Sequence, residues 1–161
     1  MADPPAIVAL FSNTVAPKGG YSLLVDGDDL CRYIAEFDTE AFDFMLSSQR
    51  YIYDDGCNIY KGPILYPLAG GRYGLRFRCD GNGFYTYRDQ SILNRIIQHA
   101  RKFEHAFVLE RGHILIANNE RWLHGRTAFR GERALMRLLL KPGSWFLRGF
   151  HFRRPELTEA A

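Results

Sequence analysis

The sequence predicts a mainly β domain with flanking helices, built as a β-sandwich or a jelly roll. Three observations lead to this fold class. Many short apolar segments are separated by turns rich in glycine, proline and aspartate, a few helical segments lie among them, and no repeat or long linker interrupts the pattern. With 161 residues, 47% of them hydrophobic, the chain suits a single domain over residues 1–161.

The N-terminal third predicts two strands followed by two helices. Residues 6–11 are a continuous apolar run, typical of a buried strand, and residues 21–25 form a second strand after a Pro-Lys-Gly-Gly turn. Asp28 or Asp29 is the expected N-cap of the first helix, which ends near residue 36. The second helix is expected to begin at residue 38 or 39. Its predicted buried side chains are those of Phe42, Met45 and Leu46.

The remaining chain alternates short strands with one further helix. Strands are expected at residues 51–53, 59–60, 64–66, 73–77, 106–109, 113–117 and 134–140. Asp89 is the expected N-cap of a helix over residues 91–101, whose apolar positions recur at helical spacing. His99 and His105 are expected to be solvated, and His124 is expected to lie in a loop before the last long strand.

Composition and charge exclude several classes of function. The net charge is only +3, and the basic, aromatic-rich C-terminus favours aromatic packing on the body over nucleic-acid binding, because no other basic face is evident. The longest apolar runs are too short to span a bilayer, and residues 1–5 do not resemble a signal peptide. Cys31, Cys57 and Cys79 form no Cys-x-x-Cys pair, so we expect no zinc site or disulfide framework. We therefore expect a cytoplasmic protein with no nucleic-acid or membrane partner.

Candidate binding residues are concentrated in one stretch of the chain. It comprises residues 119–129, with Arg133 and Arg137 after it. It contains the imidazole of His124, a common ligand for iron, zinc or copper, and then two guanidiniums that can bind carboxylates in bidentate fashion. The pattern suits a metal ion held beside a dicarboxylate. The alternative is that the arginines simply pair with Glu132 or Glu110 on a strand.

The residues of this stretch also carry a family resemblance. Residues 112–119 (Gly-His-Ile-Leu-Ile-Ala-Asn-Asn) and 123–129 (Leu-His-Gly-Arg-Thr-Ala-Phe) resemble the C-terminal signature of Fe(II)/2-oxoglutarate-dependent oxygenases. The similar branch is the taurine dioxygenase and clavaminate synthase-like superfamily, including the γ-butyrobetaine hydroxylase type. Residues 4–6 and 19–27 resemble the segment that follows the family's first metal motif. The resemblance implies a double-stranded β-helix (jelly roll), N-terminally truncated to the last two-thirds of the family's fold.

The resemblance implies roles for a few side chains. His124 would be the distal histidine ligand of Fe(II). Arg133 would bind a carboxylate of 2-oxoglutarate, Arg137 would assist it, and the hydroxyl of Ser22 would hydrogen-bond the same cosubstrate. Arg126 and Asn119 would shape the loop around the metal.

The family's first metal motif is the feature that the sequence does not contain. Relatives supply a histidine and a carboxylate from a His-x-Asp or His-x-Glu motif a few residues before the prolines that correspond to Pro4 and Pro5. Here that position falls before Met1, and no other histidine is followed two residues later by an acidic residue. We therefore expect a jelly roll that lacks the N-terminal strands, with an open sheet edge suited to a homodimer or a partner chain.

Two functional hypotheses follow. The first is an oxygenase acting on a small amino-acid-like or carboxylate metabolite, active if an upstream segment, a partner chain or an unrecognised substitution supplies the other metal ligands. The second is a non-catalytic or non-oxidative descendant that binds a carboxylate ligand or a partner chain.

Overall fold

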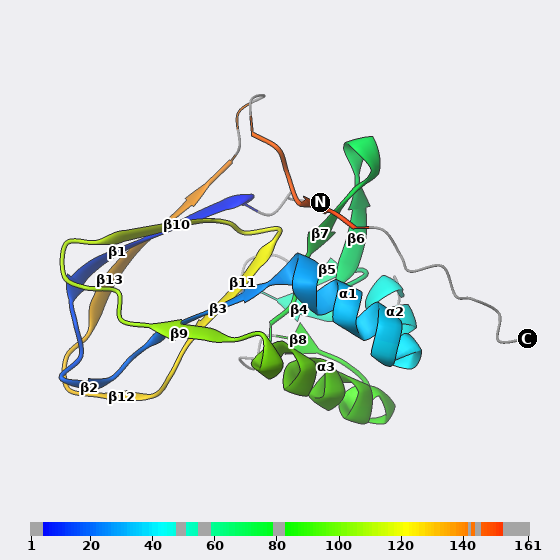
Figure 1. Ribbon diagram of the computed structural model, residues 1–161, viewed down its shortest axis with the longest axis horizontal. Helices are drawn as coiled ribbons and strands as arrows, with labels where there is room; N and C mark the ends of the chain where they lie inside the picture. The colour runs from blue at the N-terminus through cyan, green and yellow to red at the C-terminus, as the bar shows by residue number, and fades with distance from the viewer. Residues whose placement is uncertain are drawn as a thin grey trace, which may run out of the picture.

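Two antiparallel sheets form one half of the molecule (Figure 1). The computed structural model describes residues 5–47, 51–54, 59–78, 83–141, 143 and 146–152. The first sheet has the order β10-β1-β13 and the second has the order β11-β3-β9. The strands of the first sheet are β1 (Ile7–Thr14), β10 (Ile114–Asn118) and β13 (Ala134–Leu140). Those of the second are β3 (Ser22–Asp26), β9 (His105–Phe107) and β11 (Trp122–Arg126).

Short strands complete the β structure. A two-stranded ribbon of β2 (Lys18–Gly19) and β12 (Phe129–Arg130) lies where the two sheets join. Two further sheets have the orders β14-β7-β6 and β5-β4-β8. Their strands are β4 (Ile52–Asp54), β5 (Ile59–Lys61), β6 (Leu65–Leu68), β7 (Arg72–Leu75), β8 (Gly83–Phe84) and β14 (Phe150–His151). Short 3-10 turns cover Ala69–Gly71 and Tyr87–Asp89.

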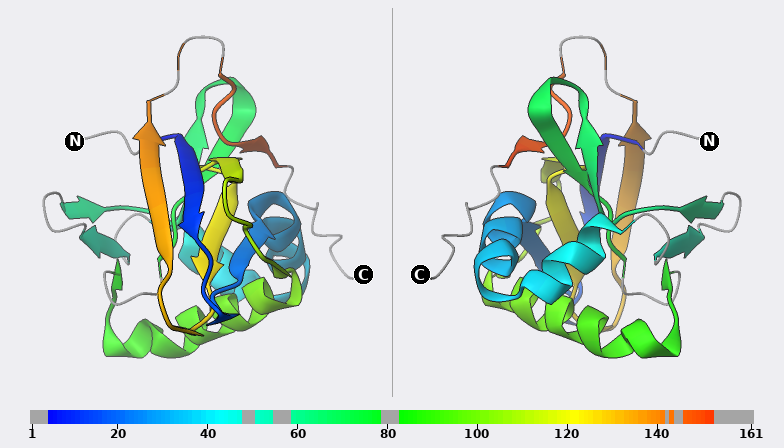
Figure 2. Two further views of the ribbon diagram at one scale, coloured as in Figure 1. Left: turned by 90° about the vertical axis from the view of Figure 1, so that its left-hand side faces the viewer. Right: turned by 90° about the vertical axis from the view of Figure 1, so that its right-hand side faces the viewer.

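The helices α1 (Gly27–Phe37), α2 (Thr39–Leu46) and α3 (Gln90–Lys102) gather at the opposite half (Figures 1 and 2). The main core lies among them and the strands beside them. Its fully buried members include Leu30, Ile34, Phe42, Met45 and Ile96. None of the helices in the described residues is both long and apolar enough to cross a membrane.

The C-terminal aromatic residues close this core. Phe150 and Phe152 are 2% and 7% exposed, and Phe152 lies edge-on to Tyr73 with ring centroids 6.0 Å apart. This confirms the expectation that aromatic side chains of the C-terminus pack on the body. The expectation for Leu46 was wrong, because its side chain is 36% exposed and Phe44 is buried in α2 instead.

The N-cap of α1 also differs from the expectation. Asp26, and not Asp28 or Asp29, caps the helix: its Oδ1 accepts a hydrogen bond from the backbone N–H of Asp28 at 3.0 Å. Asp89 stands at the N-cap position of α3 as expected, but its carboxylate accepts a hydrogen bond from the Thr86 hydroxyl at 2.8 Å and makes no cap bond to the helix backbone.

Two histidines lie in settings other than those expected. His124 lies within strand β11 and pairs with Leu24 of β3, so it is part of a sheet and not of a loop. His99 is not solvated: its side chain is 16% exposed, and its Nε2 lies 3.0 Å from Oδ2 of Asp38. In both cases a tertiary contact, invisible in the local sequence, sets the environment.

Candidate functional site

Strand register brings His124, Arg126 and Ser22 onto one face of the second sheet. His124 pairs with Leu24, and Arg126 pairs with Ser22, so all three lie on the same side by strand alternation. Val25 and Leu123, which alternate with them, turn the other way and pack in the core with the helices. The face that carries His124 is called the inner face here, because it is turned toward the first sheet.

Arg137 approaches this face from the first sheet. It pairs with Leu10 of β1 and shares its side of the sheet with the inward positions Leu135 and Leu139. His124 keeps solvent access, but desolvation by the protein atoms around its ring lowers its pKa. A hydrogen bond with the Trp122 backbone raises the pKa, and the positive charges of Arg137 and Arg78 lower it further. The imidazole is therefore held in its neutral form, which is the form that binds metals.

Arg133 lies next to the Gly19–Gly20 turn. Gly20 has φ +74°, and a Cβ built on it would lie 3.1 Å from Cδ of Arg133, so glycine here permits both the backbone conformation and the close approach of the arginine. The Arg133 guanidinium lies 6.0 Å from the ring centroid of Phe129, and that of Arg126 lies 4.9 Å from the same centroid. Burial lowers the pKa of Arg133, and the Arg126 charge adds to this effect.

These guanidiniums have no acidic partner among the residues that the structure describes. Arg126, Arg133 and Arg137 form no ion pair in the described part of the chain, so pairing with Glu132 or Glu110 is not observed. The Ser22 side chain on the same inner face is 3% exposed, and its hydroxyl has no hydrogen-bond partner in the described part of the chain. A buried hydroxyl without a partner is costly, whereas Arg126 and Arg137 are exposed and Arg133 is half-buried, so water can solvate these guanidiniums until an anion binds.

A second buried hydroxyl escaped the sequence reasoning. Ser12 is 1% exposed, and its Oγ has no hydrogen-bond partner within the described ranges. It pairs with Leu135 on the inward side of the first sheet. In the sequence it is the first of three polar residues, Ser12, Asn13 and Thr14, that follow an apolar run, which resembles an ordinary strand end.

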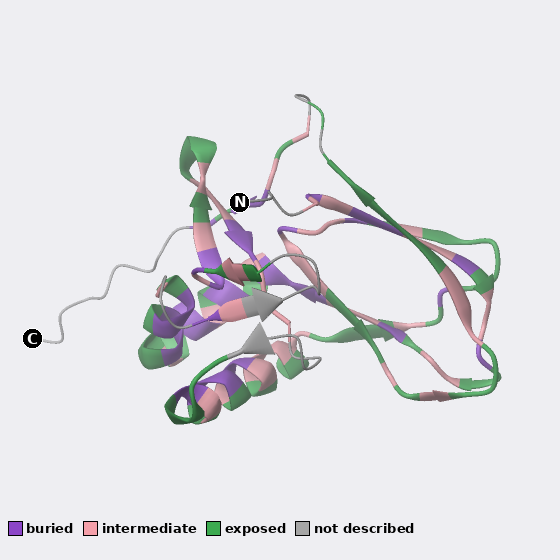
Figure 3. Cartoon of the chain, turned by 180° about the vertical axis from the view of Figure 1, so that it is seen from behind, coloured by how far each residue is buried: buried purple, intermediate pink, exposed green. Residues whose placement is uncertain are grey.

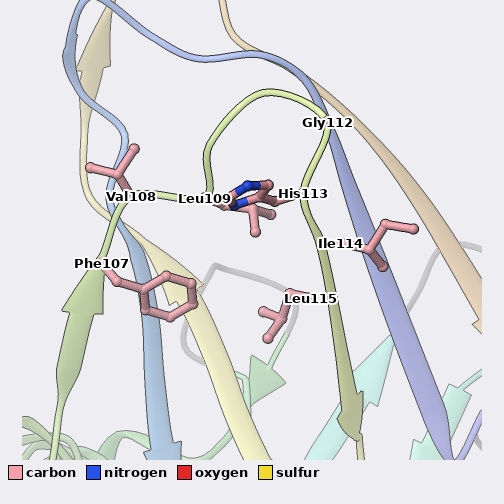
Figure 4. Close-up of a pocket in the computed structure, with 7 residues that line it drawn as sticks. All are labelled: Phe107, Val108, Leu109, Gly112, His113, Ile114 and Leu115. Atoms are coloured by element: carbon pink, nitrogen blue, oxygen red, sulfur yellow. The ribbon is translucent and has the colours of Figure 1, made fainter.

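A cavity of about 550 Å³ opens beside the turn between β9 and β10 (Figure 4). Phe107 of the second sheet and Leu115 of the first line it, together with Leu109 and His113, so residues from both sheets border the cavity. Phe107 also pairs with Ser22. This hollow is open to solvent, is bordered by residues of both sheets, and presents polar as well as apolar surface.

The donor set fits a dicarboxylate better than a metal ion. Within the described ranges, no group of three or more His, Cys, Asp or Glu side chains could hold a metal. His105 shares the inner face but is separated from His124 by the intervening strand β3. A three-ligand site of the two-histidine, one-carboxylate type is therefore not formed by the described residues.

Comparison with known proteins identifies similar chains. The family model described as "Taurine catabolism dioxygenase TauD, TfdA family" matches residues 1–139. Trimethyllysine dioxygenase of Neurospora crassa is 32% identical over 136 residues, which cover 73% of this chain and 28% of that protein. The family resemblance inferred from the sequence is thereby confirmed.

Solved oxygenases share the fold. An asparagine oxygenase in complex with Fe(II), 3-hydroxyasparagine and succinate superposes with a TM-score of 0.69 at 17% identity, covering 85% of this chain and 46% of that one. The non-heme iron oxygenase OrfP, in complex with Fe and α-ketoglutaric acid, gives 0.61 at 17% identity, covering 86% and 45%. The predicted jelly-roll fold class is confirmed. The chain spans about half the length of these enzymes and less than a third of the trimethyllysine dioxygenase.

Proposed function

Because the chain belongs to the taurine catabolism dioxygenase TauD, TfdA family, we propose that it binds 2-oxoglutarate as the cosubstrate side of an Fe(II)/2-oxoglutarate-dependent oxygenase. One observation carries the proposal. Ser22, whose buried hydroxyl has no hydrogen-bond partner among the described residues, pairs across the sheet with Arg126, and Arg133 lies against Gly20, two residues before Ser22. That arrangement suits an anion with a carboxylate at its far end.

The proposed roles follow the positions along the inner face. Arg133 and Ser22 bind the distal carboxylate of 2-oxoglutarate, since Arg133 lies against Gly20, two residues before Ser22. Arg137 assists nearer to His124, whose pKa its charge affects. His124 supplies one neutral imidazole to Fe(II). When bound, the iron would supply the site for oxygen chemistry, but the described donors do not complete its coordination, so we assign no catalytic step to this chain.

The proposed substrate is a small amino-acid-like or carboxylate metabolite. The relatives support this class: one is a trimethyllysine dioxygenase, and the asparagine oxygenase holds 3-hydroxyasparagine. The hollow of about 550 Å³ beside the turn between β9 and β10 is open to solvent and is lined by Phe107, the strand partner of Ser22.

Calorimetric titration of the chain with 2-oxoglutarate tests the proposal. Arg133→Gln is expected to weaken binding about 10- to 100-fold, because a charged hydrogen-bonding partner is lost. Ser22→Ala is expected to weaken it less. Arg88→Gln, a change at an exposed arginine outside the inner face, is the matched control and should bind as the wild type does. A monocarboxylate, 2-oxobutyrate, should bind far more weakly; equal affinity for the two acids would contradict the assignment.

A non-catalytic or non-oxidative carboxylate-binding role is the second candidate. In the described residues, Ser22 and the arginines could bind an anion, but the donors for a metal ion are incomplete. This contrast favours the second candidate. The two candidates separate on addition of Fe(II), a small amino acid and oxygen to the 2-oxoglutarate complex. Succinate formation supports the oxygenase, whereas unchanged 2-oxoglutarate with retained binding supports the second candidate.

A further inference from the structure

The space between the two sheets is open along the side where the edge strands β11 and β13 lie. On the inner face of β11, His124 and Arg126 are exposed. On the inward side of β13, Arg137 is exposed as well, and Leu139 is 49% exposed. The opposite side is closed by the turn at residues 108–113, which joins β9 to β10. A small ligand can therefore enter between the sheets from the side of β11 and β13.

The strands next to these edges form the floor of the opening, and each of them carries a buried serine. β3, beside β11, carries Ser22, which is 3% exposed, and β1, beside β13, carries Ser12, which is 1% exposed. β1 is buried or half-buried over most of its length, whereas β13 is mostly exposed (Figure 3). Among the described residues, the hydroxyls of these two serines are the buried side-chain oxygens that have no hydrogen-bond partner.

Strand register places Ser12 between two arginine positions. Its partner on β13 is Leu135. Arg133 and Arg137 stand two residues before and two residues after that partner. Arg137 pairs with Leu10, two residues before Ser12, so Ser12 and Arg137 are diagonal neighbours on the inward side of the sheet. The hydroxyl thus belongs to the same side of the sheet as the guanidinium that affects His124.

The backbone is irregular at the same place. The pairing of β1 with β13 shifts register directly after Ser12, between Ser12 and Thr14. Such a bulge re-aims the side chains beside it, and bulges are common next to binding and active sites. The register shift is therefore a second, independent observation that sets Ser12 apart from an ordinary strand residue.

A carboxylate suits the donors that meet at this floor. Its two oxygens offer about four acceptor positions. The Arg133 guanidinium can occupy two of them in bidentate fashion, and the Ser22 hydroxyl can occupy a third. One position is left, and Ser12 is the buried donor on the facing sheet that has no other partner in the described residues.

We propose that Ser12 is a further cosubstrate-binding residue, whose hydroxyl donates a hydrogen bond to the distal carboxylate of 2-oxoglutarate. The side chains that cover Ser12 turn aside as the anion enters, and the carboxylate is then held from both sheets. This role rests on the proposed function, and it adds a residue that lies outside the stretches that carry the family resemblance.

Calorimetric titration with 2-oxoglutarate, and with 2-oxobutyrate, which lacks the distal carboxylate, tests the proposal. Ser12→Ala is expected to weaken 2-oxoglutarate binding about 10-fold and to leave 2-oxobutyrate binding unchanged. Ser12→Cys nearly keeps the side-chain volume but has only a weak donor, so it should behave in the same way and replaces an alanine variant that does not fold. Asn13→Ala is the matched control, because Asn13 is the next residue of β1 and is exposed.

Thermal unfolding without ligand separates binding from a structural role. Ser12→Ala removes a buried hydroxyl that makes no hydrogen bond in the unliganded protein, so its unfolding midpoint should be at or above that of the wild type. Saturating 2-oxoglutarate should then raise the midpoint of the wild type by more than that of the variant.

The possible failures are distinguishable. If the wild type does not bind 2-oxoglutarate, the proposed function fails and the role of Ser12 fails with it. If the wild type binds and Ser12→Ala binds equally well, only the role of Ser12 is overturned. Equal weakening of both acids, or a lower unliganded midpoint for Ser12→Ala, would also overturn it, because the serine would then support the fold and not the distal carboxylate.

Discussion

Arg121 binds both carboxylate oxygens of Asp26, with Nε 2.9 Å from Oδ1 and Nη2 2.6 Å from Oδ2. The same carboxylate caps α1, and the backbone carbonyl of Arg121 accepts a hydrogen bond from the N–H of Gly27 at 2.9 Å. Asp26 ends the strand that begins with Ser22, and Arg121 directly precedes the strand that carries His124. One ion pair therefore ties both strands of the proposed site to the first helix.

Removal of this carboxylate should destabilise the fold measurably. Asp26→Ala loses a cap bond and a bidentate ion pair at a residue that is 9% exposed, so we expect a loss of about 2–3 kcal/mol in the free energy of unfolding. Asp28→Ala is the control, since its partner Arg32 is 54% exposed and a surface pair contributes less than about 1 kcal/mol. Urea unfolding measures both; equal losses would show that the Asp26 pair is no stronger than a surface pair.

A pH-dependent contribution is expected at Asp38, between α1 and α2. Burial opposes ionisation of this carboxyl, but hydrogen bonds from Arg95 and His99 outweigh burial and lower its pKa from 3.8 to about 2. A lowered pKa means that the stabilisation is complete above the unfolded value and is lost as the pH falls from about 4 toward 2. The corresponding free energy is about 2 kcal/mol, and the side chain is 12% exposed.

Asp38→Asn tests this contribution, because asparagine can still cap α2 but cannot ionise. We expect the variant to lose about 2 kcal/mol at pH 7 and to unfold with a flatter dependence between pH 4 and 2. Asp29→Asn, at an exposed position in the first turn of α1, should retain the wild-type pH dependence. Parallel wild-type and Asp38→Asn curves in acid would contradict the assignment.

The His124 imidazole offers a direct measure of the inner face. Its pKa is lowered by the surrounding protein atoms first and by the charge of Arg137 in addition, so Arg137→Gln should move the pKa upward. The charges that lower this pKa are those of Arg137 and Arg78, so Arg133→Gln is expected to leave the pKa unchanged. NMR titration of the ring protons distinguishes the two variants. An identical response in both would mean that Arg137 does not approach His124.

The sequence predicted β13 at residues 134–140, because an unbroken apolar run is a local signal. It did not predict that Asp26 caps α1. Three aspartates within residues 26–29 are equally able to cap, and only Arg121, distant in the sequence, selects one of them. Strand β10 shows the same limit: Ile114 and Ile116 lie in the expected strand, but periodicity alone cannot say that their side of the sheet remains exposed.

For the candidate site, the residue types came from the family resemblance and their arrangement came from the fold. Ser22, His124 and Arg137 were all named from the sequence, but strand pairing was needed to show that Ser22 and His124 share one face and that Arg137 approaches from the opposite sheet. Ser12 was not identified, because a hydroxyl at a strand end is usually solvated and only the packing of the two sheets buries it.

The buried carboxylate of Glu120 gives the sharpest stability prediction. Glu120 is 1% exposed; Arg148 binds it from the C-terminal segment, and the Tyr66 hydroxyl donates to its Oε1 at 3.1 Å. Burial and the charge of Glu120 raise the pKa of Tyr66, so the phenol remains a donor. Arg148→Met should therefore strand a buried charge and cost about 3–5 kcal/mol.

A double-mutant cycle separates two free energies: the destabilisation caused by the unpaired Glu120 carboxylate, and the stabilisation contributed by the Glu120–Arg148 ion pair. Glu120→Gln combined with Arg148→Met should recover much of the loss, because a neutral amide carries no charge that needs the guanidinium. Arg32→Met, at an exposed ion pair, is the control and should cost less than about 1 kcal/mol. If urea unfolding gives a loss for Arg148→Met no larger than that of Arg32→Met, then solvent already screens Glu120 and the C-terminal segment is not anchored by this pair.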